Sequence, residues 1–152
     1  MTIYDTLMAD LKTAMLAKDA ARTQVLRSIK SALSLAEIAA RTDGARTTLD
    51  DAAVTQVLMK AAKQRKDSIT QFQAAGRDDL AAIEIAELAL IEHYLPTMMS
   101  EDEIRALATA AIAKTGAAGP GDMGKVMGAL MPQVKGKADG ALVNSVVKSL
   151  LS

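Results

Sequence analysis

Residues Gly121 to Leu151 read GDMGKVMGALMPQVKGKADGALVNSVVKSLL, and this stretch decides how the last third of the chain folds. Seven of the nine glycines lie between Gly116 and Gly140, after a long region rich in alanine and leucine. Apolar residues recur at helical spacing on both sides of a glycine-containing segment. They are Met123, Val126, Met127 and Leu130 before it, and Leu142, Val143, Val146, Val147 and Leu150 after it. We therefore predict two short helices joined by a basic turn.

The first of these helices should begin at Asp122, whose carboxylate can accept hydrogen bonds from free backbone N–H groups. Pro132 should end or bend it soon after its apolar stripe. Gly124 and Gly128 lie four residues apart and so share one face of the helix. Each glycine costs roughly 1 kcal/mol relative to alanine inside a helix. Close approach of another backbone would compensate for this cost, and that backbone is either a neighbouring helix or an RNA.

Four segments, in the same order along the chain, together resemble the GatB/YqeY family. They are LRSIKSAL from Leu26, KQRKDSITQFQAAGRDDLA from Lys63, the E-x-x-x-I-x-x-YLP pattern from Glu87, and MGKVMGALMP followed by VKGKADGALVNSVVKSLL. The family includes free-standing YqeY-like proteins and the helical tail of the B subunit of bacterial tRNA-dependent amidotransferases. The resemblance covers nearly the whole chain.

The resemblance implies an accessory protein that binds tRNA or associates with a tRNA enzyme. In the amidotransferase, the related tail binds the body of the tRNA. An aminoacyl-tRNA synthetase or an amidotransferase is accordingly a possible partner. The tail residues that match the family motif are expected to contact RNA, the lysines through phosphates and the glycines by close backbone approach. They are Lys125, Gly128, Lys135, Gly136, Lys137 and Lys148.

Composition limits the class of protein. Half of the 152 residues are hydrophobic but only 2% are aromatic, so the core must consist of aliphatic side chains that favour helices. There is no cysteine, no apolar run long enough to span a membrane and no N-terminal signal-peptide pattern, and the net charge is zero. We expect an all-α, cytoplasmic protein that binds neither membranes nor DNA.

Helix boundaries predict two domains. Capping residues and glycines delimit four helices, at about residues 3–18, 20–40, 51–75 and 78–94. Leu95-Pro96 should end this antiparallel four-helix domain, which occupies residues 1–95. A capping box, Ser100-x-x-Glu103, begins a helix at about residues 101–114 that ends at Gly116. With the two short helices it forms a three-helix tail domain, residues 96–152.

One charged residue interrupts the apolar row of each helix in the second pair. Arg65 interrupts the row of the third helix, and Glu87 interrupts the row Leu80, Ile83, Leu90 and Tyr94 of the fourth. A tight antiparallel hairpin centred near Arg77 would bring Arg65 close to Glu87. We predict an ion pair at the edge of the bundle; the alternative is that both side chains extend separately into water.

A second basic patch lies in the third helix, at Lys60, Lys63 and Lys66. No aromatic side chains alternate with these lysines, so a solvated helix face is the simpler interpretation. The patch is kept as a secondary candidate for phosphate contact.

No pattern in the chain indicates catalysis. His93 is the only histidine, and it has no cluster of metal-ligating neighbours. Neither a nucleophile turn nor a phosphate-binding loop of the known spacing is present. We therefore expect no metal and no cofactor. The family's label, glutamine-dependent carbon–nitrogen ligase, has no site in this chain. The remaining alternative is a protein-binding adaptor for a synthetase or the ribosome, suggested by Met123, Met127 and Met131 at helical spacing.

Overall fold

The computed structural model describes residues 1–152, and it contains seven α-helices, one short 3₁₀ helix and no strand. The predicted all-α class is confirmed. The chain divides into two compact units, Met1–Leu95 and Pro96–Ser152. No helix is both long enough and apolar enough to span a membrane.

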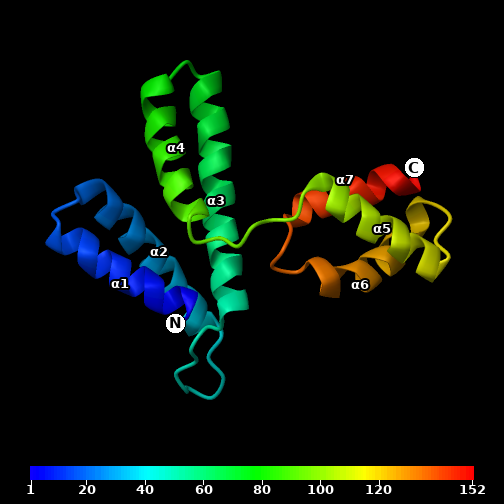
Figure 1. Ribbon diagram of the computed structural model, residues 1–152, viewed down its shortest axis with the longest axis horizontal. Coiled ribbons are helices and arrows are strands. Elements are labelled where there is room, and N and C mark those ends of the chain that lie inside the picture. The colour runs from blue at the N-terminus through cyan, green and yellow to red at the C-terminus, as the bar shows by residue number, and fades with distance from the viewer. The chain divides into compact units, whose positions relative to one another are not determined.

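The first unit consists of two antiparallel helical hairpins (Figure 1). One pairs α1 (Ile3–Leu16) with α2 (Ala20–Ala39), and the other pairs α3 (Asp51–Ala74) with α4 (Asp78–Glu92). Side-chain caps determine three of the four starts, because Thr2, Asp19 and Asp50 each accept a hydrogen bond from a backbone N–H of the first turn. Each helix ends within two residues of the predicted position.

The core of the first unit lies where the two hairpins meet. It takes Leu7 and Leu11 from α1, and Leu26, Ile29 and Leu33 from α2. The second hairpin contributes residues from the first half of α3, namely Val54, Leu58, Ala61 and Ala62. It also contributes Ile91 from the last turn of α4, and Tyr94, which follows that helix. The far half of this hairpin extends beyond α1 and α2 (Figure 1). The predicted apolar row of α4 is therefore wrong at Ile83, which is 55% exposed because nothing but α3 lies beside that part of the helix.

The second unit packs α5 (Glu101–Thr115) against both α6 (Met123–Val134) and α7 (Gly140–Leu151). The predicted capping box is confirmed: the Ser100 side chain accepts from the N–H of Glu103, and the Glu103 carboxylate accepts from the N–H of Ser100. Gly116 ends α5 in the left-handed conformation, with φ of 67°. The core contains Ile104, Ala108, Val126, Leu130, Val134, Val143, Val146, Val147 and Leu151.

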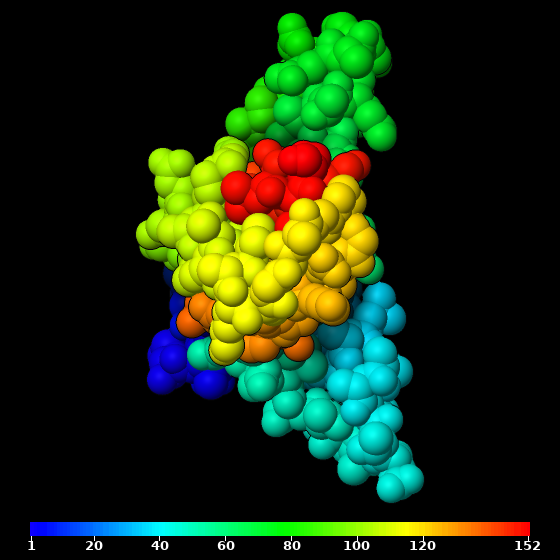
Figure 2. Space-filling model, turned by 90° about the vertical axis from the view of Figure 1, so that its right-hand side faces the viewer, coloured from blue at the N-terminus to red at the C-terminus, as the bar shows by residue number.

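A short 3₁₀ helix, η1 (Pro120–Asp122), leads into α6. After the turn, α7 runs back along α6 and contacts η1. Figure 2 shows the resulting surface, with the end of α7 in red beside the yellow segment that precedes α6. As predicted, α6 ends soon after Pro132, at Val134, two residues past the proline.

Candidate nucleic-acid interface

Two of the predicted RNA-contacting lysines flank the glycine of the α6–α7 turn. Lys135 caps the end of α6, and Gly136 follows in the left-handed conformation with φ of 73°. The N–H of Lys137 donates to the Val134 carbonyl at 2.9 Å, and the N–H of Met99 donates to the Lys137 carbonyl at 2.8 Å. The backbone of this turn is therefore fixed on both sides. Both lysine side chains are exposed, and neither lies within 4 Å of a carboxylate.

The other two lysines lie at the opposite ends of their helices. Lys125 is in the first turn of α6, and its Nζ lies 3.7 Å from Oδ1 of Asp122. Lys148 is in the last turn of α7, exposed and without an ion-pair partner. Lys148 lies eight residues after Gly140, the first residue of α7, which corresponds to about 12 Å along the helix axis at 1.5 Å per residue. The structure thus brings Lys135 and Lys137 together and leaves Lys148 well separated from them.

The exposed face of α6 carries both of its internal glycines. Val126, Leu130 and Val134 face the core, whereas Gly124, Lys125, Gly128 and Pro132 are exposed. A Cβ built on Gly124 or on Gly128 would meet no atom within 4 Å. A neighbouring helix of the second unit as the compensating backbone is therefore wrong, because no other helix of that unit comes within 4 Å of either added Cβ.

Pro132 lies on the same face of α6 and removes one of its backbone hydrogen bonds. A proline carries no N–H, so the carbonyl of Gly128, four residues earlier, receives no helical hydrogen bond from residue 132. Neither Gly128 nor Gly124 has a side chain that could cover the backbone. The face therefore presents polar backbone to solvent between Lys125 and Lys135.

The predicted side-chain cap by Asp122 is also wrong. Asp122 stands at the first position before α6, but its carboxylate does not accept from the first turn of that helix. Instead Oδ2 of Asp122 accepts from the N–H of Ala118 at 3.0 Å, which folds the preceding loop back on itself. This backbone hydrogen bond, with the nearby Lys125 ammonium, lowers the pKa of the Asp122 carboxyl. Asp122 is thus ionised and offsets the charge of Lys125.

The secondary basic patch on α3 is largely paired with carboxylates. Lys63 lies 3.1 Å from Asp67, and Lys66 lies 3.7 Å from Glu92. Lys60 alone of the three has no partner within 4 Å, so the patch offers fewer free cations than the tail turn.

Arg65 and Glu87 are in contact, as the hairpin geometry predicts. The Nε of Arg65 donates to Oε2 of Glu87 at 3.1 Å, and a terminal guanidinium nitrogen lies 3.3 Å from the Ser28 hydroxyl. The side chains are only 15% and 20% exposed. The pair therefore joins α3 to α4 and reaches α2 at the point where the second hairpin leaves the core.

The methionine stripe belongs mainly to the core of the second unit. Met123 and Met127 are half-buried and pack against the buried cluster, and only Met131 is exposed. No group of three or more histidine, aspartate or glutamate side chains is arranged to hold a metal ion. His93 caps α4, and its ring meets that of Tyr94 edge to face at 5.3 Å between centroids.

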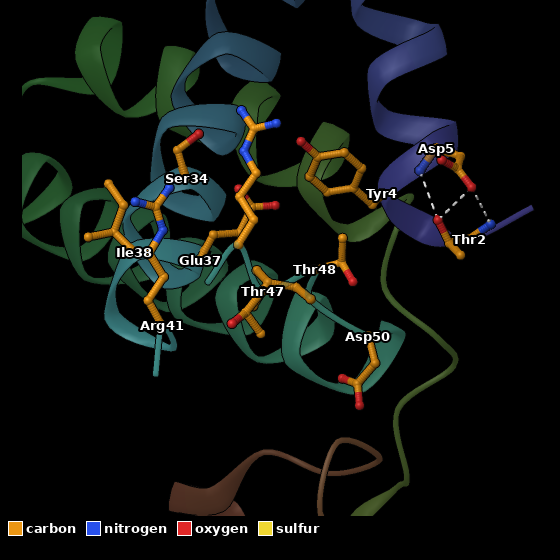
Figure 3. A pocket seen from close by; sticks show the side chains of 12 residues that line it. Thr2, Tyr4, Asp5, Ser34, Glu37, Ile38, Arg41, Thr47, Thr48 and Asp50 are labelled. Atoms are coloured by element: carbon orange, nitrogen blue, oxygen red, sulfur yellow. Dashed lines mark hydrogen bonds between the residues drawn. The ribbon is translucent and has the colours of Figure 1, made fainter. Parts of the chain in front are cut away.

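Sequence reasoning missed a hollow of about 720 Å³ in the first unit. It lies between the start of α1, the end of α2 and the loop before α3, and Figure 3 shows its side chains. Arg41 and Arg46 line it together with Glu37, Asp5 and Asp50, so opposite charges are mixed in it. Asp5 and Asp50 already cap helices. The loop residues have no periodic pattern that could have indicated the hollow.

Comparison with known proteins identifies the family. The sequence matches the family described as Yqey-like protein over residues 4–151. The chain belongs to the YqeY-like family. A protein from Meyerozyma guilliermondii named "Altered inheritance of mitochondria protein 41, mitochondrial" is 39% identical over 94 residues, which cover 62% of this chain and 47% of that protein.

Proteins of the same name from two other yeasts are similarly related to this YqeY-like chain. The one from Saccharomyces cerevisiae strain YJM789 is 38% identical over 98 residues, covering 64% of the chain and 51% of that protein. The one from Clavispora lusitaniae is 38% identical over 105 residues, which cover 68% of this chain and 58% of that protein. The chain spans about half the length of the curated relatives it matches. Their names say mitochondrial, whereas the cytoplasmic location expected for this YqeY-like protein stays a prediction.

Proposed function

We propose that this YqeY-like protein is a non-catalytic accessory protein that binds tRNA through its second unit. The proposal rests on the resemblance of residues 96–152 to the tail of the amidotransferase B subunit, which binds the tRNA body. An aminoacyl-tRNA synthetase or an amidotransferase would then be the enzyme that it assists.

The observation that carries the proposal is the open face of α6. Two helix-weakening glycines, Gly124 and Gly128, lie there with no other part of the second unit within 4 Å of an added Cβ. Lys135 and Lys137 lie at one end of this face with free ammonium groups. Ammonium groups pair with phosphates, and the two glycines allow a ribose-phosphate backbone to approach the helix closely.

Recognition would depend on backbone shape and charge rather than on base sequence. The second unit contains no aromatic side chain on which a base could stack. From Gly116 onward it has four lysines and two aspartates, and one of those aspartates lies beside Lys125. Few phosphates can therefore be neutralised, and we expect binding that is modest and sensitive to salt.

Fluorescence anisotropy of the full chain with labelled total tRNA, in a series of salt concentrations, tests the proposal. The slope of log affinity against log salt concentration is negative, and each lost phosphate contact makes it less steep by about 0.7 to 0.9. The Lys135→Ala/Lys137→Ala variant should therefore have a slope that is shallower by about 1.5. The tRNA affinity of Lys148→Ala tests separately whether the end of α7 contacts RNA.

A matched control removes two exposed basic side chains of the first unit that also lack ion pairs, Lys12→Ala/Arg46→Ala. Its slope should equal that of the wild type. If the two double variants lose binding equally, or if the wild type does not bind tRNA at low salt, RNA binding by the second unit is ruled out.

A further inference from the structure

A furrow runs along the outer face of α2, in the first unit. One cavity of about 520 Å³ lies between the end of α1 and the start of α2, and a second of about 590 Å³ continues along α2. Arg27 lines both cavities, so they adjoin at this residue. Ser34 lines the second cavity and also the hollow beyond it (Figure 3). We call this surface, from Lys18 to Ile38, the α2 furrow.

The α2 furrow is basic and its charges are unpaired. Lys18, Arg27 and Lys30 line its two cavities, and no carboxylate does. None of the three cations lies within 4 Å of an acidic oxygen, whereas Arg22 on the same helix lies 3.5 Å from Asp10. The free cations are thus concentrated along the two cavities.

Large apolar side chains lie among these cations. Leu35 is 68% exposed and Ile38 is 55% exposed, and Met15 at the other end is 49% exposed. Arg27, Ser31, Ser34 and Ile38 follow each other at intervals of three and four residues, so they share one side of the helix. Leu35 and Ile38 lie three residues apart and form an exposed apolar pair that the apolar surface of a partner can cover.

We propose that the α2 furrow docks an acidic amphipathic helix of a partner protein. The partner's apolar side chains cover Met15, Leu35 and Ile38, and its carboxylates pair with Lys18, Arg27 and Lys30. From Lys18 to Ile38 the furrow is about 30 Å long at 1.5 Å per residue, which matches a helix of about 20 residues. An RNA backbone fits the cations but would leave the apolar side chains uncovered, and no aromatic side chain lines the two cavities for base stacking.

Synthetic peptides of 20 residues test the proposal against the isotope-labelled full chain by NMR. The first carries leucines at i, i+3, i+4 and i+7 spacing with glutamates beside them. The second has the same composition in scrambled order, and the third has lysines in place of the glutamates. The first peptide should shift the amide signals of Arg27, Ser31 and Leu35, leave those of the second unit unchanged, and bind at least fivefold more tightly than the other two.

A charge reversal sharpens the test. Arg27→Glu/Lys30→Glu should weaken binding of the acidic peptide at least tenfold and create binding of the lysine peptide. The control Lys60→Glu/Lys114→Glu changes the net charge equally at two exposed, unpaired lysines elsewhere, and should change neither affinity by more than about twofold. If the charge-reversed chain does not fold, Leu35→Ser/Ile38→Ser replaces it; these exposed positions tolerate polar residues, and the variant should lose the acidic peptide while retaining tRNA binding.

The proposal is overturned if the scrambled peptide binds as tightly as the acidic amphipathic peptide, or if the charge-reversed variant binds the acidic peptide as tightly as the wild type does. It is also overturned if tRNA, and not the peptide, shifts the amide signals of the furrow. The last result would assign the furrow to RNA. The test is independent of the proposed tRNA binding by the second unit, because a chain that binds no tRNA can still bind the peptide.

Discussion

The phenol of Tyr94 donates a hydrogen bond to the carboxylate of Asp10, 84 residues earlier in the chain, at 2.5 Å between oxygens. Tyr94 is 8% exposed and follows the end of α4, while Asp10 lies in the middle of α1. A guanidinium nitrogen of Arg22 on α2 lies 3.5 Å from the same Asp10 oxygen. This contact joins the end of the second hairpin to both helices of the first.

We expect Tyr94→Phe to destabilise the first unit without changing its fold. A hydrogen bond to a charged group contributes about 1.5 to 3 kcal/mol. Because the Asp10 carboxylate stays near Arg22 and solvent in the variant, we expect a loss at the lower end, about 1.5 kcal/mol. Urea unfolding followed by circular dichroism measures it. Tyr4→Phe is the matched control, since no hydrogen bond involves the Tyr4 hydroxyl, and it should change the free energy of unfolding by less than about 0.5 kcal/mol.

Stability should depend on pH through the same tyrosine. Burial raises the pKa of Tyr94, and the hydrogen bond to Asp10 raises it further. The folded-state pKa is therefore above the unfolded value of about 10. The contribution to stability is complete below pH 10 and is lost as the pH rises through the folded-state pKa. The free energy of unfolding should fall more steeply above pH 10 in the wild type than in Tyr94→Phe. If the free energy of unfolding falls with pH in parallel for the wild type and Tyr94→Phe, the pH dependence does not come from Tyr94.

Removing one member of the Arg65–Glu87 pair should cost more than removing both. Glu87→Ala leaves a half-buried guanidinium with only the Ser28 hydroxyl, and we expect a loss of about 2 kcal/mol. Arg65→Met/Glu87→Leu should come within about 1 kcal/mol of the wild type, because it leaves no unpaired charge. A double-mutant cycle measured by urea unfolding gives the coupling energy. The exposed Lys63–Asp67 pair serves for comparison and should couple by less than about 0.5 kcal/mol.

Replacing glycines of the second unit by alanine should raise the free energy of unfolding at some positions and lower it at another. Gly124→Ala/Gly128→Ala should raise the free energy of unfolding by about 1 to 2 kcal/mol, because both positions are helical and open. Gly136→Ala should lower it by about 1 kcal/mol, because its φ of 73° strains any residue with a Cβ. Thermal unfolding followed by circular dichroism separates the two effects.

The α6 variant also bears on RNA binding. If an RNA backbone approaches the glycine face, Gly124→Ala/Gly128→Ala should be more stable than the wild type and yet bind tRNA several-fold more weakly. Unchanged tRNA affinity in the stabilised variant would mean that the RNA, if bound, lies elsewhere on the second unit.

Local signals in the sequence account for most of the secondary structure. Ser100 caps a helix as its capping box predicts, and Asp19 and Asp50 also cap helices, because a cap uses atoms within three residues of itself. Asp122 failed as a cap, because a competing backbone N–H four residues upstream takes its carboxylate. The Arg65–Glu87 contact could be predicted because a short hairpin fixes the register of two adjacent helices.

The sequence by itself determined the helices, their caps and the basic turn at Lys135–Gly136–Lys137, since these depend on spacing and backbone conformation along short segments. Only the tertiary structure decided which helix faces are covered. It showed that Tyr94 meets Asp10, that nothing in the second unit covers Gly124 and Gly128, and that Arg27, Lys30 and Leu35 line a furrow. A helical repeat indicates that a face is apolar or charged, but the packing of helices far apart in the sequence determines whether that face meets the chain itself or is left for a partner.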